Sequence, residues 1–483
     1  MEDGKCKERR RRMIGKLHGI VWGPVLLTLL LAVGIIYTFR SAGFQLFGIK
    51  VWWKATAGSL LRQEKRTGGD EKRHITKVQA ACTALAATIG TGNIVGVATA
   101  LTAGGPGAIF WMWVSAFIGM ATAYGETWLG LQYRYRNRQG AWVCGPAVYI
   151  SRGLRMPGLG LFYGVLCLLA SLGMGSMVQS NAVAQTMEFF AGIPPVICAV
   201  TVTAAACLVA VGGISRIARV AEGLIPWAAG IYMGFSVMVL GICYRQIPAA
   251  LKEIFRCALI PEAMFGGIGG YGLSRGFRYG IARGVFSNEA GLGSLAGLHG
   301  ATEDTTPEEQ GMWAMFEVFF DTVVICTLTA LVILCVTRGN LSGRYGDGAV
   351  LTARCFGAVL GKAGELLVSA SMIIFAFATM IAWFFLGRQT LEAVMEQLCL
   401  WIPLPEKTRA GIRLGYLVLY GYAVFLGCVS NLTAVWELSD IWNGMMAFPN
   451  IFALLLLQRQ VTYPGRKSAE KTDTKEVPRV IIK

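Results

Sequence analysis

Long apolar runs alternate along the chain with short polar stretches that contain most of the Lys and Arg residues. A membrane-spanning helix needs about 20 mostly apolar residues. Eleven segments satisfy this requirement, and they cover residues 19–38, 78–102, 108–132, 158–189, 194–213, 216–242, 277–300, 311–336, 364–388, 411–429 and 432–457. The pattern therefore predicts an all-α polytopic membrane protein with about 11 transmembrane helices.

The polar stretches between these segments are too short to hold a soluble domain. Three stretches, residues 43–66, 246–258 and 347–362, are amphipathic and are expected to lie along the membrane surface. We therefore divide the chain into a basic tail at 1–18, a transmembrane domain at 19–457 and a polar, disordered cytoplasmic tail at 458–483.

The composition supports this class of protein. Hydrophobic residues make up 54% of the chain and charged residues 15%, with a mean hydropathy of +0.54, whereas soluble domains have about 25% charged residues. The net charge of +16 lies in the loops and forms no stripe on a folded face, so nucleic-acid binding is not expected. The lipid bilayer of the cell (inner or plasma) membrane is the expected surrounding.

The distribution of positive charge predicts the orientation. The side that holds the C-terminus carries 27 Lys and Arg residues against 15 on the other side, so the C-terminus is expected in the cytoplasm and the N-terminus outside. The run KERRRR at 7–12 disagrees, because such a cluster favours the cytoplasm; a start of translation at Met13 would remove it. The first apolar run is followed by charge rather than by a cleavage site, so it is expected to be a retained helix.

Two of the expected spans are interrupted in the same way. Residues 87–96 read ATIGTGNIVG and residues 283–294 read RGVFSNEAGLGS, so that several Gly stand beside Thr, Ser or Asn at membrane depth. Leaving the first span aside, these two open two sets of five helices, at about 78–242 and about 277–457. Glycine-interrupted helices at equivalent places in two halves indicate a transporter's midplane site, because unwound backbone offers N–H and C=O groups to a ligand. Close helix packing through small residues is the alternative.

Both motifs resemble those of a known family. The segments CTALAATIGTGNIVGVATALTAGGPGAIFWMWVSAFIGMATAYGE (82–126) and RGVFSNEAGLGS closely resemble the alanine or glycine:cation symporter family, and VFFDTVVICTLTAL (318–331) and FAFATMIAW (375–383) extend the match. The resemblance implies a leucine-transporter-like core of five plus five helices in inverted repeat, preceded by one extra helix. It also implies Na⁺-driven uptake of small neutral amino acids such as alanine or glycine.

In such a fold the substrate carboxylate is expected on backbone amides of the first broken helix, at Thr91, Gly92 and Asn93. The ammonium group is expected to face carbonyls of the second, near Phe286, Ser287 and Asn288. Phe286 and Trp383 are candidate walls of a small side-chain pocket, with lipid or packing contact as the alternative for both aromatic residues.

The coupling Na⁺ is expected where carbonyls of Ala87 and Gly90 meet the hydroxyl of Thr379, because hard cations take oxygen ligands. The family usually has Ser-Thr where this chain has Ala378-Thr379. One candidate hydroxyl is therefore missing, so Na⁺ binds more weakly, uses a water, or is replaced by another ion. Ala382 and residues 384–388 (FFLGR) also depart from the family pattern, which leaves substrate size and cation choice open.

Ionisable residues at membrane depth are functional candidates because they are costly there. Asp321 lies in mid-span one turn after Glu317 and is expected to serve coupling or gating, unless neighbouring Thr and Ser hydroxyls merely satisfy it. Glu289 lies inside the second interruption and is the other coupling or gating candidate, or a cap of the adjoining half-helix. Glu126 is expected to reach the membrane interface.

Other classes of protein find little support. The 13 Cys form no C-x-x-C pair, the three His are far apart, and there is no Walker A or H-E-x-x-H motif, so we expect no enzyme, no cofactor and no transition-metal site. A channel is the remote alternative, and a proton-coupled or exchange-type amino-acid carrier is the nearer one. No obligate protein partner is inferred.

Overall fold

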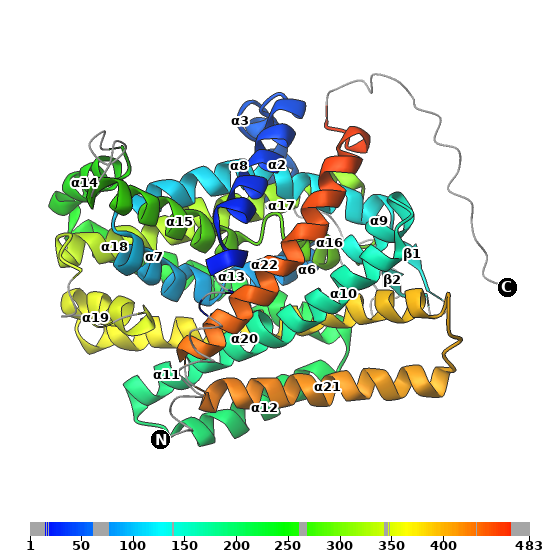
Figure 1. The fold of residues 1–483 in the computed structure, drawn as a ribbon. Coiled ribbons are helices and arrows are strands. Elements are labelled where there is room, and N and C mark those ends of the chain that lie inside the picture. Colours follow the sequence, from blue (N-terminus) through cyan, green and yellow to red (C-terminus); the bar gives the residue numbers. More distant parts are fainter. Residues whose placement is uncertain are drawn as a thin grey trace.

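The computed structural model describes residues 15, 17, 19–60, 77–137, 140–259, 268–341, 346, 348–430 and 432–464. The helices before residue 260 are α2 (Pro24–Arg40), α3 (Phe44–Phe47), α4 (Ile49–Ala55), α5 (Ala57–Leu60), α6 (Lys77–Thr88), α7 (Val97–Gly104), α8 (Gly107–Gln132), α9 (Pro146–Gly153), α10 (Pro157–Leu172), α11 (Gln179–Ala191), α12 (Pro195–Val211), α13 (Ile214–Ile242) and α14 (Ile247–Leu259). The later helices are α15 (Ile268–Asn288), α16 (Ser294–His299), α17 (Pro307–Val318), α18 (Thr327–Thr337), α19 (Gly348–Leu360), α20 (Lys362–Leu398), α21 (Glu406–Val429) and α22 (Leu432–Leu457). The fold is all-α, as predicted (Figure 1).

Shorter elements interrupt or join these helices. Three π-helical segments, η1 (Gly92–Gly96), η2 (Gly173–Val178) and η5 (Phe319–Cys326), lie inside longer helical runs. Two 3₁₀ turns, η3 (Tyr244–Gln246) and η6 (Gln458–Gln460), follow α13 and α22. Strands β1 (Tyr135–Arg136) and β2 (Trp142–Val143) form a small antiparallel hairpin after α8, with Tyr135 opposite Val143. Since π-helical turns are frequent at functional sites, their positions become important below.

Within the described residues, eight helical runs are long and apolar enough to cross a membrane, and a ninth is the bent pair Val78–Thr88 and Gly92–Gly104. Each of the eleven predicted ranges is helical. Two of these ranges do not pass this test of length and apolar composition. They are α12, which has 17 residues, and the interrupted pair α15 and α16. The class of polytopic membrane protein is therefore confirmed, and the number eleven stays a prediction.

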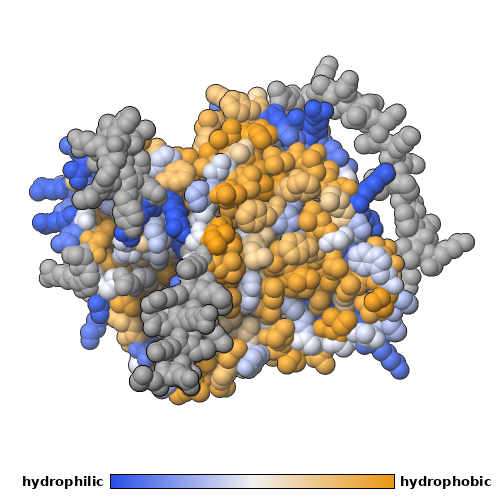
Figure 2. All heavy atoms as spheres, in the orientation of Figure 1, coloured by the Kyte–Doolittle hydropathy of each residue, from blue (hydrophilic) through white to orange (hydrophobic). Residues whose placement is uncertain are grey.

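The surface agrees with this class. Hydrophobic residues dominate the middle of the face in Figure 2, while hydrophilic residues gather at its left and right edges. In the same orientation α20 and α21 run across the molecule from left to right (Figure 1). Large apolar side chains on α21, such as Val418 and Leu419, are exposed. An apolar belt between two polar rims is the surface that a bilayer requires.

The helices form two sets of five in the predicted order. The sets are α6–α7, α8, α10–α11, α12 and α13, followed by α15–α16, α17–α18, α20, α21 and α22. The first four members of one set each contact the corresponding member of the other, through α7 and α15, α8 and α17, α11 and α20, and α12 and α21. This pairwise packing brings the two interrupted helices together in the core. The repeat boundaries at 78–242 and 277–457 remain a prediction.

The three amphipathic stretches form short helices. Residues 43–60 fold as α3, α4 and α5, while α14 and α19 occupy the second and third stretches. The tails at 1–14 and 465–483, and therefore the KERRRR cluster, lie outside the described residues, so the orientation in the membrane stays a prediction.

Close packing between α8 and α15 depends on small residues. A Cβ atom on Gly280 of α15 would lie 2.3 Å from the Ala108 carbonyl oxygen and 2.6 Å from Trp111 Cβ, both on α8. Small residues at such a crossing let two backbones approach closely in a membrane.

We expect Gly280→Val to destabilise the protein by about 1–3 kcal/mol, the usual range for overpacking, because the α8 backbone has to move. The measurement is the midpoint of thermal unfolding in detergent. Gly230→Val on α13 is the matched control, since a Cβ there meets nothing within 4 Å. Equal midpoints for the two variants would contradict close packing at this crossing.

Candidate substrate and cation site at two broken helices

The first broken helix bends by 44° between α6 and η1–α7. α6 ends at Thr88, and the chain resumes helical geometry at Thr91. Asn93 stabilises the break, because its side-chain oxygen accepts the Gly90 N–H over 2.9 Å. The Thr91 hydroxyl is buried and has no hydrogen-bond partner among the described residues. The break therefore presents backbone and hydroxyl groups that the helix itself does not use.

The second broken helix is interrupted between Asn288 and Ser294. Three residues of the interruption, Glu289, Gly291 and Gly293, have positive φ values of 58°, 88° and 87°. A left-handed backbone cannot continue an α-helix, so the chain unwinds here. Unwound backbone at membrane depth has to be satisfied by the surrounding protein.

Neighbouring helices satisfy this unwound backbone. The Gly293 N–H donates to Glu126 Oε2 on α8 over 3.1 Å. On the other side, the Asn450 amide on α22 donates to the Gly291 carbonyl over 2.9 Å and also to Glu126 Oε2 over 3.1 Å. The Tyr163 hydroxyl on α10 donates to the Leu292 carbonyl over 3.0 Å. Three helices thus hold the interruption in place.

Asp321 joins the two breaks. Its carboxylate accepts Asn93 Nδ2 from the first break over 2.6 Å, Ser287 Oγ from the end of α15 over 2.7 Å, and the adjacent Thr322 hydroxyl over 2.8 Å. The breaks also touch directly, since a Cβ on Gly92 would lie 3.0 Å from Ser287 Cα. Asp321 is fully buried in η5. The serine and threonine hydroxyls foreseen as its partners do contact it, and one of them belongs to a broken helix.

Thr379 of α20 faces the first break. Its hydroxyl lies 2.9 Å from the carbonyl oxygens of Ala86 and of Phe375, and 3.4 Å from that of Ile89. A hydroxyl has one hydrogen and two lone pairs, so it donates to one carbonyl while an oxygen lone pair stays available. The carbonyls of Ala86 and Ile89, rather than Ala87 and Gly90, are those that Thr379 contacts.

Gln179 completes this side of the site. Its Oε1 accepts the Thr91 N–H over 3.3 Å, and its Nε2 donates to the Met174 carbonyl over 3.2 Å. Gln179 follows η2 directly, at the start of α11. The sequence analysis missed this residue. Its signal is a Gly-rich stretch, GMGSMVQS at 173–180, inside the third of the first five helices.

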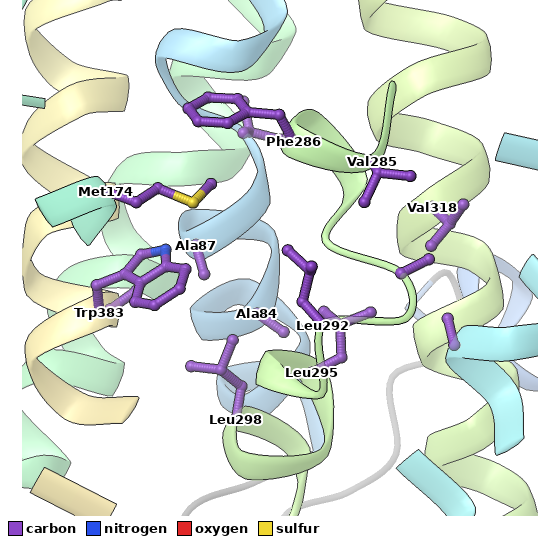
Figure 3. Packing of buried hydrophobic residues seen from close by; sticks show 14 of the residues in the cluster. Ala84, Ala87, Met174, Val285, Phe286, Leu292, Leu295, Leu298, Val318 and Trp383 are labelled. Carbon is purple, nitrogen blue, oxygen red and sulfur yellow. The ribbon is translucent and has the colours of Figure 1, made fainter. Parts of the chain in front are cut away.

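The two aromatic candidates have different surroundings. Figure 3 shows the Trp383 indole close to Ala87 of the first broken helix, and the Phe286 ring farther from Ala87, above Met174. The Trp383 indole N–H donates to Glu289 Oε1 over 2.9 Å. The Phe286 ring stacks on Trp436 of α22, with ring centroids 5.1 Å apart. Both aromatic residues are buried.

An ion pair lies beside Phe286. Arg283 Nη2 donates to Asp440 Oδ2 over 2.7 Å, and the guanidinium carbon lies 5.2 Å from the Phe286 ring and 5.3 Å from the Trp436 ring. The pair ties the end of α15 to α22. Arg278 and Arg283 border an open cavity of about 410 Å³ on this side, together with Trp22 and Tyr279.

A second polar chain lies around α16. The Thr305 hydroxyl donates its single hydrogen to Glu309, so the Gln310 side-chain N–H donates to Thr305 and the Gln310 oxygen accepts His299 Nδ1 over 2.6 Å. His299 Nε2 then faces Glu317 Oε2 over 3.0 Å. Because Nδ1 carries a hydrogen and donates it to Gln310, the contact between Nε2 and Glu317 needs a second hydrogen, either on Nε2 or on the Glu317 carboxyl group. His299 and Glu317 are both fully buried.

The structure thus brings most of the predicted residues to one region. Asn93 and Ser287 converge on Asp321, while Asn288 donates to the Thr322 hydroxyl over 3.1 Å. Glu289 contacts Trp383, and α16 begins after Gly293, which has no side chain for capping. The expectation for Glu126 is wrong. It is fully buried, because α8 packs against α2, α15, α16 and α17, and the unwound backbone takes up its carboxylate.

A polytopic protein with two interrupted helices that meet at membrane depth belongs to the class of secondary transporters. A sequence profile of the sodium:alanine symporter family matches residues 7–480, and the chain therefore belongs to this family. The sodium/alanine symporter AgcS of Methanococcus maripaludis is 36% identical over 92% of this chain and 94% of its own. A transporter of Haemophilus influenzae is 35% identical over 93% and 94%.

Solved structures are less similar. The manganese transporter of Eremococcus coleocola, in complex with an aromatic bis-isothiourea substituted compound, has a TM-score of 0.48 and 13% identity, covering 80% of this chain and 77% of its own.

Asn93→Ala is expected to abolish alanine uptake while the protein still reaches the membrane. The substitution removes the acceptor of the Gly90 N–H and the donor to Asp321 together, so the first break loses its shape. Radiolabelled alanine uptake, normalised to the amount of protein in the membrane, measures the effect. Thr99→Ala on α7 is the control, because its hydroxyl donates to the Val95 carbonyl one turn earlier in the same helical run. Unchanged transport by Asn93→Ala would remove this residue from the site.

Proposed function

We propose that this chain is a Na⁺-coupled symporter that takes up a small neutral amino acid, alanine or glycine, across the cell membrane by alternating access. The observation that carries the proposal is the convergence of both broken helices on one buried carboxylate, Asp321. The Thr379 hydroxyl lies against the first of these helices. Membership of the sodium:alanine symporter family, and the similarity to AgcS, support the same substrate and ion.

The zwitterion of the amino acid is matched by two kinds of backbone group. Its carboxylate is assigned to Thr91, Gly92 and Asn93, where charge-assisted hydrogen bonds are stronger than neutral ones. The Thr91 N–H, which donates to Gln179 Oε1 over 3.3 Å, is a donor assigned to the carboxylate. The unused Thr91 hydroxyl adds a further donor.

The ammonium group is assigned to the carbonyls of Phe286, Ser287 and Asn288 at the end of α15, where the last turn has no onward helical partners. Trp383 and Phe286 bound the space for the side chain. Because both are large and fully buried, the pocket suits a methyl group or a hydrogen atom.

Na⁺ is assigned to the hydroxyl of Thr379 and to the carbonyls of Ala86 and Ile89 that this hydroxyl contacts, each one residue before the predicted Ala87 and Gly90. Hard cations favour oxygen ligands, and the carbonyls of Ala86 and Ile89 already lie within 3.4 Å of that hydroxyl. The nearby negative charge of Asp321 favours a cation at the same break. Asp321 thus serves coupling by tying the cation site to both broken helices.

Alanine uptake into proteoliposomes tests the function. We expect accumulation above equilibrium with an inward Na⁺ gradient and none when choline replaces Na⁺, because the gradient is the driving force. An imposed pH gradient without Na⁺ is the control arm. Uptake driven by protons alone, or exchange without accumulation, would overturn Na⁺ coupling; saturable uptake also separates a carrier from a channel.

Proton coupling or exchange is the second candidate, and two observations favour it. Ala378 leaves the cation site without the second hydroxyl that its family usually has, and the His299–Glu317 contact is completed by a proton. Under Na⁺ coupling, Ala378 leaves a weaker Na⁺ site. Under proton coupling or exchange, Ala378 is the reason that Na⁺ is no longer the coupling ion.

Ala378→Ser is expected to lower the Na⁺ concentration for half-maximal uptake several-fold, because it adds an oxygen beside Thr379. Thr379→Val, which removes the remaining hydroxyl, is expected to raise it or to abolish Na⁺ dependence. Initial rates of alanine uptake over a range of Na⁺ concentrations measure both. If neither variant changes the Na⁺ dependence, the cation site lies elsewhere.

A further inference from the structure

Glu289 occupies a backbone position that favours glycine. Five non-glycine residues with positive φ occur among the described residues; four are exposed at the ends of helices or in turns, and Glu289 alone is fully buried. Its neighbours at equivalent backbone angles, 291 and 293, are both glycine. A left-handed conformation strains a residue that has a Cβ. The side chain of Glu289 must therefore serve a purpose that glycine cannot.

Burial adds a second cost. Glu289 is 0% exposed, and a carboxylate without water is unfavourable unless it is hydrogen-bonded. The Trp383 indole N–H donates to one carboxyl oxygen, Oε1, over 2.9 Å, while Oε2 is buried without a hydrogen-bond partner among the described residues. The break in α15–α16 is thereby connected to α20 through one side-chain contact.

Trp383 is held from the opposite side as well. A Cβ on Gly175 of η2 would lie 2.4 Å from Trp383 Cβ, so the root of the indole rests on the η2 backbone. Trp383 also follows Thr379 by four residues on α20, so the two share the helix face that meets the first break. Figure 3 shows the indole turned toward Ala87 and Met174. The backbone at Gly175 fixes the position of Trp383 Cβ, and Glu289 fixes the N–H edge of the indole ring.

We propose that Glu289 is a positioning residue for Trp383, and that this contact sets the upper limit on the size of the substrate side chain. The inference rests on the proposed amino-acid transport and deepens it, because it assigns size selection to one hydrogen bond. Without the contact the indole turns about its χ angles, and the pocket admits branched aliphatic amino acids. With it, only small side chains fit.

Substrate selectivity in proteoliposomes tests the assignment. The readout is the ratio of kcat/KM for alanine to kcat/KM for valine under the same Na⁺ gradient. We expect Glu289→Ala to lower this ratio about tenfold, since one or two methylenes in an apolar pocket are discriminated by about 10–200-fold. Glu289→Gln keeps an acceptor for the indole and is expected to stay within about threefold of the wild type. Glu188→Ala near the end of α11 is the matched control, because its side chain is exposed.

The partner variant makes the test independent of how well Glu289→Ala folds. Trp383→Phe removes the indole N–H and is expected to lower the ratio to a similar extent. In the double variant the two effects are expected not to add, because both remove the same contact. A wild-type ratio in Trp383→Phe, or additive effects in the double variant, overturns the proposal.

Na⁺ dependence separates positioning from coupling. We expect the Na⁺ concentration for half-maximal alanine uptake to stay unchanged in Glu289→Gln and Trp383→Phe. A changed Na⁺ dependence with unchanged selectivity would make Glu289 a coupling residue instead, and an equal loss for alanine and valine would make it structural. Both results overturn the proposal. Absence of Na⁺-driven alanine uptake in the wild-type protein is a distinct result that overturns the proposed function.

Discussion

One buried carboxylate organises the centre of this protein. Asp321 has no access to water, and an isolated charge there would be costly by several kcal/mol. Its three hydrogen-bond donors come from the first break, the end of α15 and its own helix. Neither broken helix can therefore move without changing the solvation of the same charge. This shared dependence gives a physical route by which events at one break reach the other.

The unwound backbone imposes a second requirement. Every N–H and C=O that a helix no longer satisfies needs a partner in the membrane. Glu126, Asn450 and Tyr163 provide partners at the second break from three different helices. Small residues at the crossings, such as Gly280 and Gly92, let these helices come close enough to do so. The surrounding helices thus supply the hydrogen-bond partners that the interruptions lack. The geometry of the interruptions therefore depends on the whole bundle.

The Arg283–Asp440 pair has a different character. Two nitrogens of the guanidinium, Nε and Nη1, are buried without a hydrogen-bond partner among the described residues. A buried ion pair that is only partly hydrogen-bonded gains little net free energy, because desolvation offsets the attraction. Separation of α15 from α22 would let water reach these N–H groups. The contact is therefore one that a moving helix can break at small cost.

The amino-acid sequence by itself determined the class of protein, the positions of the helices and the two interruptions. Apolar length and clustered glycines are local signals, because each reflects the bilayer or the backbone at that place. Asp321 was recognisable as an ionisable residue at membrane depth. Asn93 and Ser287 became candidates through the resemblance to the symporter family. Only the tertiary structure decided their partners. Which helix faces which decides the roles of Gln179 and Glu126 and the contact between Glu289 and Trp383. A contact between residues 94 positions apart leaves no periodic pattern in the sequence.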